Sequence, residues 1–328
     1  MPLRQLAAGL RESRHGSAAH VGTAESGTDH RTGDLRLGAV IVTMGNRPAE
    51  LAALLASVRA QVGPPVPVVV VGNGTARPGH RLPDLGADVQ VVELPENLGL
   101  IVGRNIGLDV LRSRGDIDVV MYLDDDGLLL DPRTAEKLRE AFVADPSLGI
   151  VSFRIADETG TTQRRHVPRL LVGDPARGSE VTTFLGGGNA IRMALIDQVG
   201  AWSEDFYWAH EETDLAWRAL DVGWRILYRP DIVLQHPRTS PARHGSTYYR
   251  FTARNRVWLA RRYLPLPLIP VYLCAWIVVT LARRPPLDGL RDWWAGFVQG
   301  WREHAGPRRP IRWKTVWRMT RLGRPPII

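Results

Sequence analysis

A run of five apolar residues followed by three aspartates constrains this chain more than any other feature. Val119–Leu123 is rich in β-branched and large side chains, which is typical of a strand buried on both faces in a parallel sheet. Asp124, Asp125 and Asp126 follow at once. Three carboxylates in one turn repel one another unless a positive charge lies among them, and a divalent cation carrying phosphate oxygens is the usual compensation. Ligands of open α/β sheets bind beyond the carboxyl ends of the strands, so these acids are expected at a binding site. A solvated acidic turn is the alternative that the three residues alone leave open.

Apolar runs at regular intervals indicate that this strand is one of several. Runs rich in β-branched residues predict strands at 37–43, 66–71, 88–94, 119–123, 150–155, 182–189, 224–228 and 232–235. Helical spacing and helix-starting prolines predict helices at about 48–62, 100–112, 132–144 and 192–199, and another that begins near residue 211. Strands that alternate with helices in this way are typical of a doubly wound α/β sheet.

The composition divides the chain into three parts. Residues 1–36 are rich in Gly, Ser, Thr, His and Arg, which predicts a flexible leader. Residues 37–240 are expected to form the α/β domain, and residues 241–328 a basic, Trp-rich helical extension. The formal net charge of +8 belongs to the end of the chain, because residues 283–328 hold 11 Lys and Arg against 3 Asp and Glu. Such a tail suits an anionic surface, either phospholipid or nucleic acid.

The extension has the pattern of a segment that contacts a membrane. Leu264–Ala282 carries no charge, but three prolines interrupt its start and leave about 15 helical residues, or ~22 Å. A hydrocarbon core is ~30 Å thick, so an interfacial or re-entrant helix is favoured over a true span. Tryptophans alternate with Arg and Lys over 287–322, which suits the lipid headgroup zone. We therefore expect residues 264–322 to contact a membrane surface.

Two features bear on the compartment. Cys274 is the only cysteine, so the chain has no internal disulfide and fits a reducing environment. The one apolar run near the start, Leu6–Leu10, is too short for the apolar core of a signal peptide. We expect a cytoplasmic protein that is peripheral at the inner face of the cell membrane.

Seven motifs, taken in chain order, resemble the family 2 glycosyltransferases. They are VIVTMGNRP (40–48), VVVVGNGT (68–75), ENLGLIVGRNIGLD (96–109), MYLDDDG (121–127), FLGGGNAI (184–191), HEETDLAWR (210–218) and His236. The resemblance covers roughly Gly38 to His236, with a weaker likeness to about Arg262. It implies an inverting nucleotide-sugar enzyme of the GT-A type: a doubly wound mixed, mostly parallel sheet flanked by helices, here with a C-terminal helical membrane-associating extension.

The resemblance also implies roles for the acids and for His236. Asp124, Asp126 and His236 match the family's metal ligands, which hold Mg2+ or Mn2+. The cation neutralises the diphosphate of the donor and stabilises it as a leaving group. The family's catalytic base is an aspartate at the position of Glu212, so this chain offers a carboxylate on a longer stem. From the residues alone, a histidine at a strand end such as His236 is more often structural, and acids in a first helical turn need no role beyond the macrodipole.

Further positions match the family's binding segments. The nucleotide and its diphosphate would be held by Thr43, Asn46, Arg47, Asn73, Asn97, Gly99, Arg104, Asn105 and Asp125. The transferred sugar and the acceptor would be held by Gly187, Gly188, Asn189, Trp208, Glu211 and Asp214. Relatives commonly carry aspartate where this chain has Gly72, so UDP is a less secure donor nucleotide than usual. The aromatic loop at 202–208 fits acceptor stacking and plain core packing equally well.

These features predict transfer of a sugar from a nucleotide-diphosphate donor to a hydroxyl of a glycan, glycolipid or other acceptor. One enzymatic alternative is a nucleotidyltransferase that makes nucleotide sugars, but such an enzyme is expected to have an early Gly-rich loop with Arg and Lys. The other alternative is a non-catalytic protein that binds membrane or nucleic acid. Nucleic acid is not expected as a partner, because the ordered part lacks stacking and groove-reading motifs.

Overall fold

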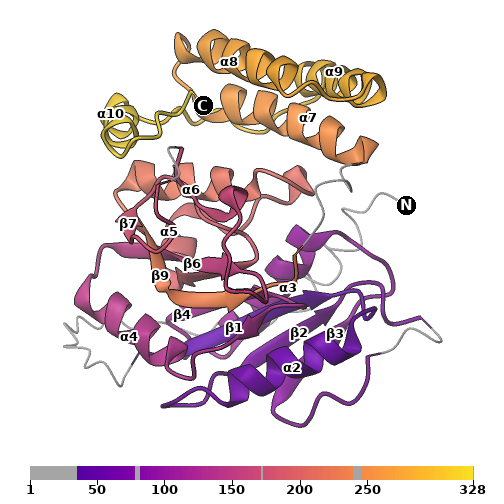
Figure 1. The fold of residues 1–328 in the computed structure, drawn as a ribbon, viewed down its shortest axis with the longest axis vertical. Helices are drawn as coiled ribbons and strands as arrows, with labels where there is room; N and C mark the ends of the chain where they lie inside the picture. The colour runs from indigo at the N-terminus through magenta and orange to yellow at the C-terminus, as the bar shows by residue number, and fades with distance from the viewer. Residues whose placement is uncertain (1–34, 78–81, 171–172, 239–244, 328) are drawn as a thin grey trace, which may run out of the picture. The chain divides into compact units, whose positions relative to one another are not determined.

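The structure is a computed structural model that describes residues 35–77, 82–170, 173–238 and 245–327. All of these residues belong to one compact unit. The expected leader at 1–36 falls outside them, apart from its last two residues. The description below concerns this part of the chain (Figure 1).

A nine-stranded sheet forms the centre of the described chain, in the order β3-β2-β1-β4-β8-β6-β9-β5, with β7 paired to β9. Six strands run in one direction, and β5, β7 and β8 oppose them. The sheet is therefore mixed and mostly parallel, as predicted. The strands are β1 (Leu37–Thr43), β2 (Val68–Gly72), β3 (Val89–Glu93), β4 (Val119–Asp124), β5 (Leu128–Leu129), β6 (Leu148–Ala156), β7 (Ser179–Glu180), β8 (Gly188–Arg192) and β9 (Arg225–Gln235).

The register of the central strands aligns their polar ends. Thr43 at the end of β1 lies beside Gly72 at the end of β2, and Val42 lies beside Asp124 at the end of β4. These strands are parallel, so their carboxyl ends meet at one edge of the sheet. That edge is where a ligand of an open α/β sheet is expected.

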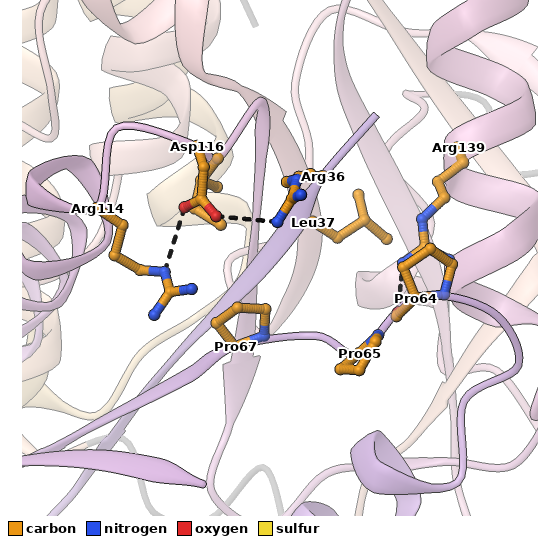
Figure 2. A pocket seen from close by; sticks show the side chains of 9 residues that line it. Arg36, Leu37, Pro64, Pro65, Pro67, Arg114, Asp116 and Arg139 are labelled. Atoms are coloured by element: carbon orange, nitrogen blue, oxygen red, sulfur yellow. Dashed lines mark hydrogen bonds and ion pairs between the residues drawn. The ribbon is translucent and has the colours of Figure 1, made fainter. Parts of the chain in front are cut away.

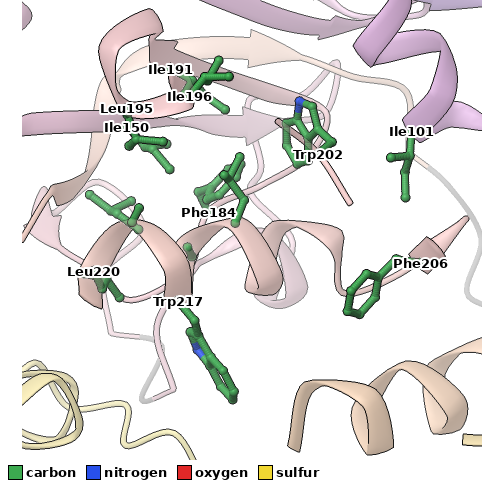
Figure 3. Close-up of a cluster of buried hydrophobic side chains, with 14 of the residues drawn as sticks. Ile101, Ile150, Phe184, Ile191, Leu195, Ile196, Trp202, Phe206, Trp217 and Leu220 are labelled. Atoms are coloured by element: carbon green, nitrogen blue, oxygen red, sulfur yellow. The ribbon is translucent and has the colours of Figure 1, made fainter. Parts of the chain in front are cut away.

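Helices cover both faces of the sheet. On one face, α2 (Pro48–Arg59) and α4 (Thr134–Ala144) bury their leucines against β1, β2 and β4. On the other face lie α3 (Leu100–Ser113), α5 (Met193–Val199) and α6 (Glu211–Val222). Figure 3 shows the second cluster, in which Phe184, Trp202, Phe206 and Trp217 fill the space around α6.

The C-terminal helices continue this second core. They are α7 (Ser246–Tyr263), α8 (Leu268–Ala282), α9 (Leu287–Arg302) and α10 (Trp313–Arg321). Val257, Trp258 and Tyr263 from α7 and Met319 from α10 belong to the same buried cluster as Trp217. The boundary expected at residue 240 therefore does not separate two independent cores. In Figure 1, α7 lies over α6, and α8 and α9 lie beyond α7.

The structure corrects several expected element bounds. The two strands expected at 224–228 and 232–235 are one strand, β9, whose pairing with β6 shifts register after Arg229. A strand was expected over 182–189, but β8 starts only at Gly188, and α4 starts at Thr134 rather than at residue 132. β5 and β7, two residues each, were not predicted, because short pairs carry no periodic pattern. Two 3-10 turns, Arg164–His166 and Glu204–Phe206, complete the described elements. The length expected for the apolar helix is confirmed: α8 has 15 residues.

Candidate active site

Two aspartates and a histidine converge at the carboxyl edge of the sheet. Asp124 ends β4, Asp126 lies in the turn after it, and His236 follows the last residue of β9. One ligand atom from each lies within 4.8 Å of the others. His236 Nε2 is 3.1 Å from Asp126 Oδ1 and 3.8 Å from Asp124 Oδ2. This donor set suits a divalent cation, since carboxylates and imidazole are common ligands of Mn2+, and carboxylates are ligands of Mg2+.

The site shifts the pKa values of these groups in the directions expected of a charged cluster. Burial acts to raise the pKa of Asp126, but His236 and Arg47 outweigh it and the pKa is lowered. Burial acts to lower the pKa of His236, but Asp126 and Asp124 outweigh it and the pKa is raised. Asp125 has a raised pKa, chiefly from burial, although its carboxylate accepts a hydrogen bond from Thr43 Oγ1 at 2.6 Å. His236 and Arg47 therefore both stabilise the ionised form of Asp126.

A pocket of about 240 Å3 adjoins the carboxylates and opens between the ends of β1, β2 and β4. Seven of the residues expected to bind metal or nucleotide line it, and β-strand register brings them together from distant parts of the chain. Its lining consists of Val42, Thr43, Met44, Asn46, Arg47, Asn73, Asn97, Leu100, Asp124 and Asp125. Arg47 Nη1 bonds to Asp126 and lies 3.4 Å from Asp125, so the guanidinium closes one side of the pocket.

Asn73 organises the wall of this pocket. Its side-chain amide nitrogen donates to Asn97 Oδ1 at 2.9 Å and to the carbonyl of Gly99 at 3.1 Å. Its side-chain oxygen Oδ1 accepts from Leu98 N at 2.8 Å. The side chain is therefore engaged by the segment that leads into α3. Gly99 takes a φ of 90°, and a Cβ there would lie 2.9 Å from the Tyr207 ring, so only glycine fits.

The departure at Gly72 has a structural explanation. A Cβ on Gly72 would collide with Thr75 Oγ1. That hydroxyl donates to Glu93 Oε1 at 3.0 Å. The place that an aspartate side chain at 72 would need is therefore filled by the Thr75–Glu93 pair.

Arg104 connects the metal-ligand cluster to the start of α6. It is 3% exposed and donates to the carbonyl of Gly186 at 2.8 Å. Its guanidinium is 3.6 Å from Asp124 and 3.9 Å from Glu211, and it lies 5.0 Å from the Trp202 ring. A buried arginine thus provides a fixed positive charge between two groups of carboxylates.

The glycines before β8 permit close approach of acids from two elements. A Cβ on Gly187 would collide with Asp124 Oδ2, and a Cβ on Gly186 would collide with Glu212 Oε1. Adjacent backbone positions therefore touch one of the candidate metal ligands and the candidate base. Gly188 begins β8, and Asn189 is fully buried, with its amide donating to the carbonyls of Leu185 and Gly186.

Glu212 has the electrostatic environment of a carboxyl group that holds its proton unusually strongly. Burial, followed by the neighbouring Glu211 carboxylate, raises the pKa of Glu212 to about 8, against the opposing charge of Arg104. Burial also raises the pKa of Glu211, which is 3% exposed and has no partner for Oε2 among the described residues. Carboxyl groups with perturbed pKa values are typical of catalytic sites, and the Gly186–Gly187 segment links Glu212 to Asp124.

The loop that leads into α6 has an uncommon backbone conformation that the sequence did not reveal. Tyr207, Ala209 and His210 have φ values of 59°, 69° and 70°, which non-glycine residues rarely adopt. Asn255 of α7 is fully buried, and its amide donates to the carbonyls of Phe206, Trp208 and Ala209 at 2.7–3.0 Å. A residue of the extension therefore holds the loop that positions Glu212.

Two of the predicted site residues are buried in the core, and a third is exposed at the surface. Asp214 is fully buried, and its carboxylate accepts from Ser203, Arg218 and Tyr263, so it stabilises the fold and leaves no oxygen exposed for a substrate. Asn105 is also buried and donates to Trp202 O and Glu204 at 3.0 Å, which ties α3 to the aromatic loop. Trp208 is 39% exposed and available at the surface, in contact with Tyr248.

A larger pocket of about 400 Å3 lies at the opposite end of β1 (Figure 2). Its charged groups already have partners: Asp116 pairs with Arg36 at 3.1 Å and with Arg114 at 3.3 Å, and Arg139 donates to the carbonyl of Pro64 at 2.8 Å. It is at the amino ends of the parallel strands, where ligands of such sheets do not bind. We therefore assign the functional site to the smaller pocket.

Comparisons with known proteins agree with this geometry. Residues 39–200 match the family described as Glycosyl transferase family 2. The pre-mycofactocin glycosyltransferases of Mycobacterium tuberculosis strains CDC 1551 / Oshkosh and ATCC 25618 / H37Rv are each 26% identical over 259 residues, which is 74% of this chain and 52% of theirs. The chain thus spans about half the length of these curated relatives.

Solved structures share the fold at low sequence identity. GalNAc-T7 with UDP, GalNAc and Mn2+ has a TM-score of 0.55 and 16% identity, and the match covers 73% of this chain and 49% of that one. TarS of S. aureus has a TM-score of 0.56 and 16% identity, with 83% and 50% covered. Its fragment 1–349 has a TM-score of 0.54 and 17% identity, with 81% of each chain covered. These matches show a GT-A fold, and residues 39–200 form a family 2 glycosyltransferase domain.

Proposed function

We propose that this protein transfers a sugar from a nucleotide-diphosphate donor to a hydroxyl of a glycan or lipid-linked acceptor, by a single displacement that inverts the anomeric centre. The observation that carries the proposal is the contact of Gly187 with Asp124 and of Gly186 with Glu212. These contacts support the proposal, because they bring a candidate metal-ligand carboxylate and a carboxyl of raised pKa to one short backbone segment. A sugar lying on that segment would have the diphosphate on one side and the base on the other.

The three candidate ligands fit a divalent cation, Mg2+ or Mn2+. Their ligand atoms are within 4.8 Å of one another, and Asp126 Oδ1 and His236 Nε2 lie 3.1 Å apart, close enough to bind one ion. A cation held there would supply Lewis-acid stabilisation of a diphosphate leaving group. The GalNAc-T7 structure, which has the same fold, holds Mn2+ and UDP.

The chain's own residues have separate tasks in this proposal. Thr43, Asn46 and Arg47 line the pocket for the nucleotide, and Arg104 places a positive charge beside Asp124. Glu212 accepts the proton of the acceptor hydroxyl as that oxygen attacks the anomeric carbon. Glu212 must be ionised to do so. The alternative of a nucleotidyltransferase has no observation in its favour, since the loop after β1 offers only Arg47 for a triphosphate.

We further propose that residues 264–322 bind a membrane surface. Within the described residues, no helix has both the length and the apolar character to cross a bilayer. Large apolar side chains are nevertheless exposed on and near α8 and α9: Leu266, Val271, Val278, Leu281, Leu287, Trp294 and Trp301 are 46–85% exposed. Exposed apolar side chains among arginines suit an interfacial helix. Our proposal is therefore that the enzyme works at the inner face of the cell membrane.

The experiment that tests the transferase proposal is a donor screen with the purified protein. Nucleotide-diphosphate sugars are incubated with Mn2+ or Mg2+ and candidate acceptors, and nucleoside diphosphate release is measured for wild type, Asp126→Asn and Glu212→Gln. The lost base is expected to cost about 10²- to 10⁴-fold in kcat. The matched controls are Asp84→Asn and Glu50→Gln, which change exposed residues away from the pocket.

Full turnover by Glu212→Gln would refute the assigned base, and full turnover by Asp126→Asn would refute the metal site. Release of pyrophosphate from a nucleoside triphosphate would support the nucleotidyltransferase alternative instead.

A further inference from the structure

A second, small cavity lies between the start of α6, α8 and the C-terminal segment. Its volume is about 30 Å3, which is room for about two ordered waters, so its occupant is a small polar group rather than a sugar. It is separate from the pocket at the carboxyl edge of the sheet. Its lining consists of Thr182, Thr183, His210, Thr213, Trp217, Tyr272, Trp276, Met319, Arg324 and Pro326.

Three polar atoms from the lining residues have no hydrogen-bond partner within the described part of the chain. They are Thr182 Oγ1, His210 Nε2 and Trp276 Nε1. Thr182 is only 2% exposed, so water outside the protein does not satisfy it. Buried polar groups in native proteins nearly always have partners, so three such atoms at one cavity indicate a bound polar group.

Two arginines beside the cavity have no carboxylate partner among the residues that the structure describes. Arg324 lines the cavity, and Arg256 of α7 is 7% exposed, with its guanidinium carbon 3.5 Å from the centroid of the Trp276 ring. Burial lowers the pKa of both arginines, that of Arg256 to about 10. Arg262 on the same helix provides the contrast, because it pairs with Asp205 at 2.9 Å and lies 3.7 Å from Asp214.

The backbone also favours an anion here. His210 is the N-cap of α6 and Thr213 lies in its first turn, so the positive end of the helix dipole adjoins the cavity. Two guanidinium groups without a carboxylate partner among the described residues, a helix start and unused hydroxyl and indole donors together match a tetrahedral oxyanion.

We propose that this cavity binds the phosphate group of a ligand through Arg256 and Arg324, with Thr182 and Trp276 donating further hydrogen bonds. The site goes beyond the proposed sugar transfer, and it can be tested by binding alone. The phosphate would come either from a soluble phosphate compound or from a lipid headgroup at the membrane surface.

The test is a titration of the full chain with inorganic phosphate, in which binding is measured by the broadening of the 31P NMR line. EDTA is present to suppress metal-dependent binding at the carboxylate site. Wild type is compared with Arg324→Gln and Arg256→Gln, and with Arg321→Gln as the matched control. Arg321 is exposed on α10 and does not line the cavity, and its substitution removes the same charge. A parallel arm measures binding to phosphatidylcholine vesicles with and without phosphatidic acid, which presents a lipid phosphate.

Loss of a charged hydrogen-bond partner is expected to weaken phosphate binding about tenfold or more in Arg324→Gln and Arg256→Gln, with no change in Arg321→Gln. If the same two variants also lose selective binding to phosphatidic acid vesicles, the source is a lipid; if only free phosphate binding changes, the source is soluble. Thr182→Val keeps both arginines and is also expected to weaken phosphate binding. This variant tests the proposal if Arg256→Gln does not fold. Equal phosphate affinity in all variants, or no saturable binding of millimolar phosphate or of phosphatidic acid by wild type, would overturn the proposal.

Discussion

Single residues set the proton chemistry of the proposed site. Glu212 is surrounded by protein and lies next to Glu211, and both effects raise its pKa, to about 8. A base acts only when ionised, so the proposed reaction is expected to accelerate as the pH rises through this pKa. Nearby Asp124 adds to the shift, and a cation bound there would act in the opposite direction.

Glu211→Gln is expected to move this pH dependence. The substitution removes a negative neighbour, lowers the pKa of Glu212 and shifts the ascending limb of kcat/KM to lower pH. The measurement is a pH–rate profile of the variant and wild type under the same metal concentration, with Glu50→Gln as the control. An ascending limb that stays in place would show that Glu211 does not act on the base.

Gly187→Ala is expected to impair the metal site without unfolding the domain. Its Cβ would collide with Asp124 Oδ2, so either the strand or the carboxylate must move. Metal affinity is expected to fall about tenfold or more, because a displaced carboxylate is lost as a ligand. Calorimetric titration with Mn2+ measures this, and Gly245→Ala is the matched control, since a Cβ there meets nothing within 4 Å. An unchanged affinity would show that Asp124 is not a metal ligand.

At the scale of elements, α7 determines the conformation of the loop before α6. The loop holds three non-glycine residues at positive φ, and the Asn255 amide is bonded to three of its carbonyls. Asn255→Leu leaves these carbonyls without a donor and is expected to cost about 2–4 kcal/mol of stability. Urea unfolding measures the loss, and Gln90→Leu, which changes an exposed residue of β3, is the control. If the folded variant keeps full turnover, the loop does not position Glu212.

The elements that carry strong patterns could be predicted from the sequence, and so could the residues on their ends. Buried apolar runs identified β1, β2 and β4, and their shared carboxyl edge brings Thr43, Asn73 and Asp124 to one pocket, as expected. The role of Asn255 could not be predicted, because it depends on a contact between loop and helix that are 46–49 residues apart. The burial of Asp214 was missed for the same reason: its partners Ser203 and Tyr263 come from other elements. Acids at a helix start look alike in the sequence, whether they face a cleft or a core.

At the scale of the whole molecule, the extension and the catalytic domain share one hydrophobic core. Val257, Trp258 and Tyr263 are buried together with Phe206 and Trp217. A tail that only anchored the protein to a membrane could be deleted with loss of membrane association and no loss of turnover. The shared core predicts a different outcome: a chain ending at residue 240 would lack Val257, Trp258 and Tyr263, expose Phe206 and Trp217, and lose most of its stability.

Circular dichroism and gel filtration of the chain truncated at residue 240 test this expectation. A monomeric, cooperatively unfolding fragment would contradict it. Membrane association is better tested with Leu287→Glu and Trp294→Glu, which change exposed side chains only. Reduced sedimentation with anionic vesicles and unchanged turnover on a soluble acceptor are expected for both.

The shared core also restricts how this enzyme can be recombined with others. In a chimera that joins its sheet to the C-terminal helices of a relative, the new junction would cross the core at Trp217, Trp258 and Tyr263. The new helices would therefore have to be repacked against α6. On the proposed roles, changing where in the cell such an enzyme works requires redesign next to Glu212, and localisation and catalysis are expected to diversify together among its relatives.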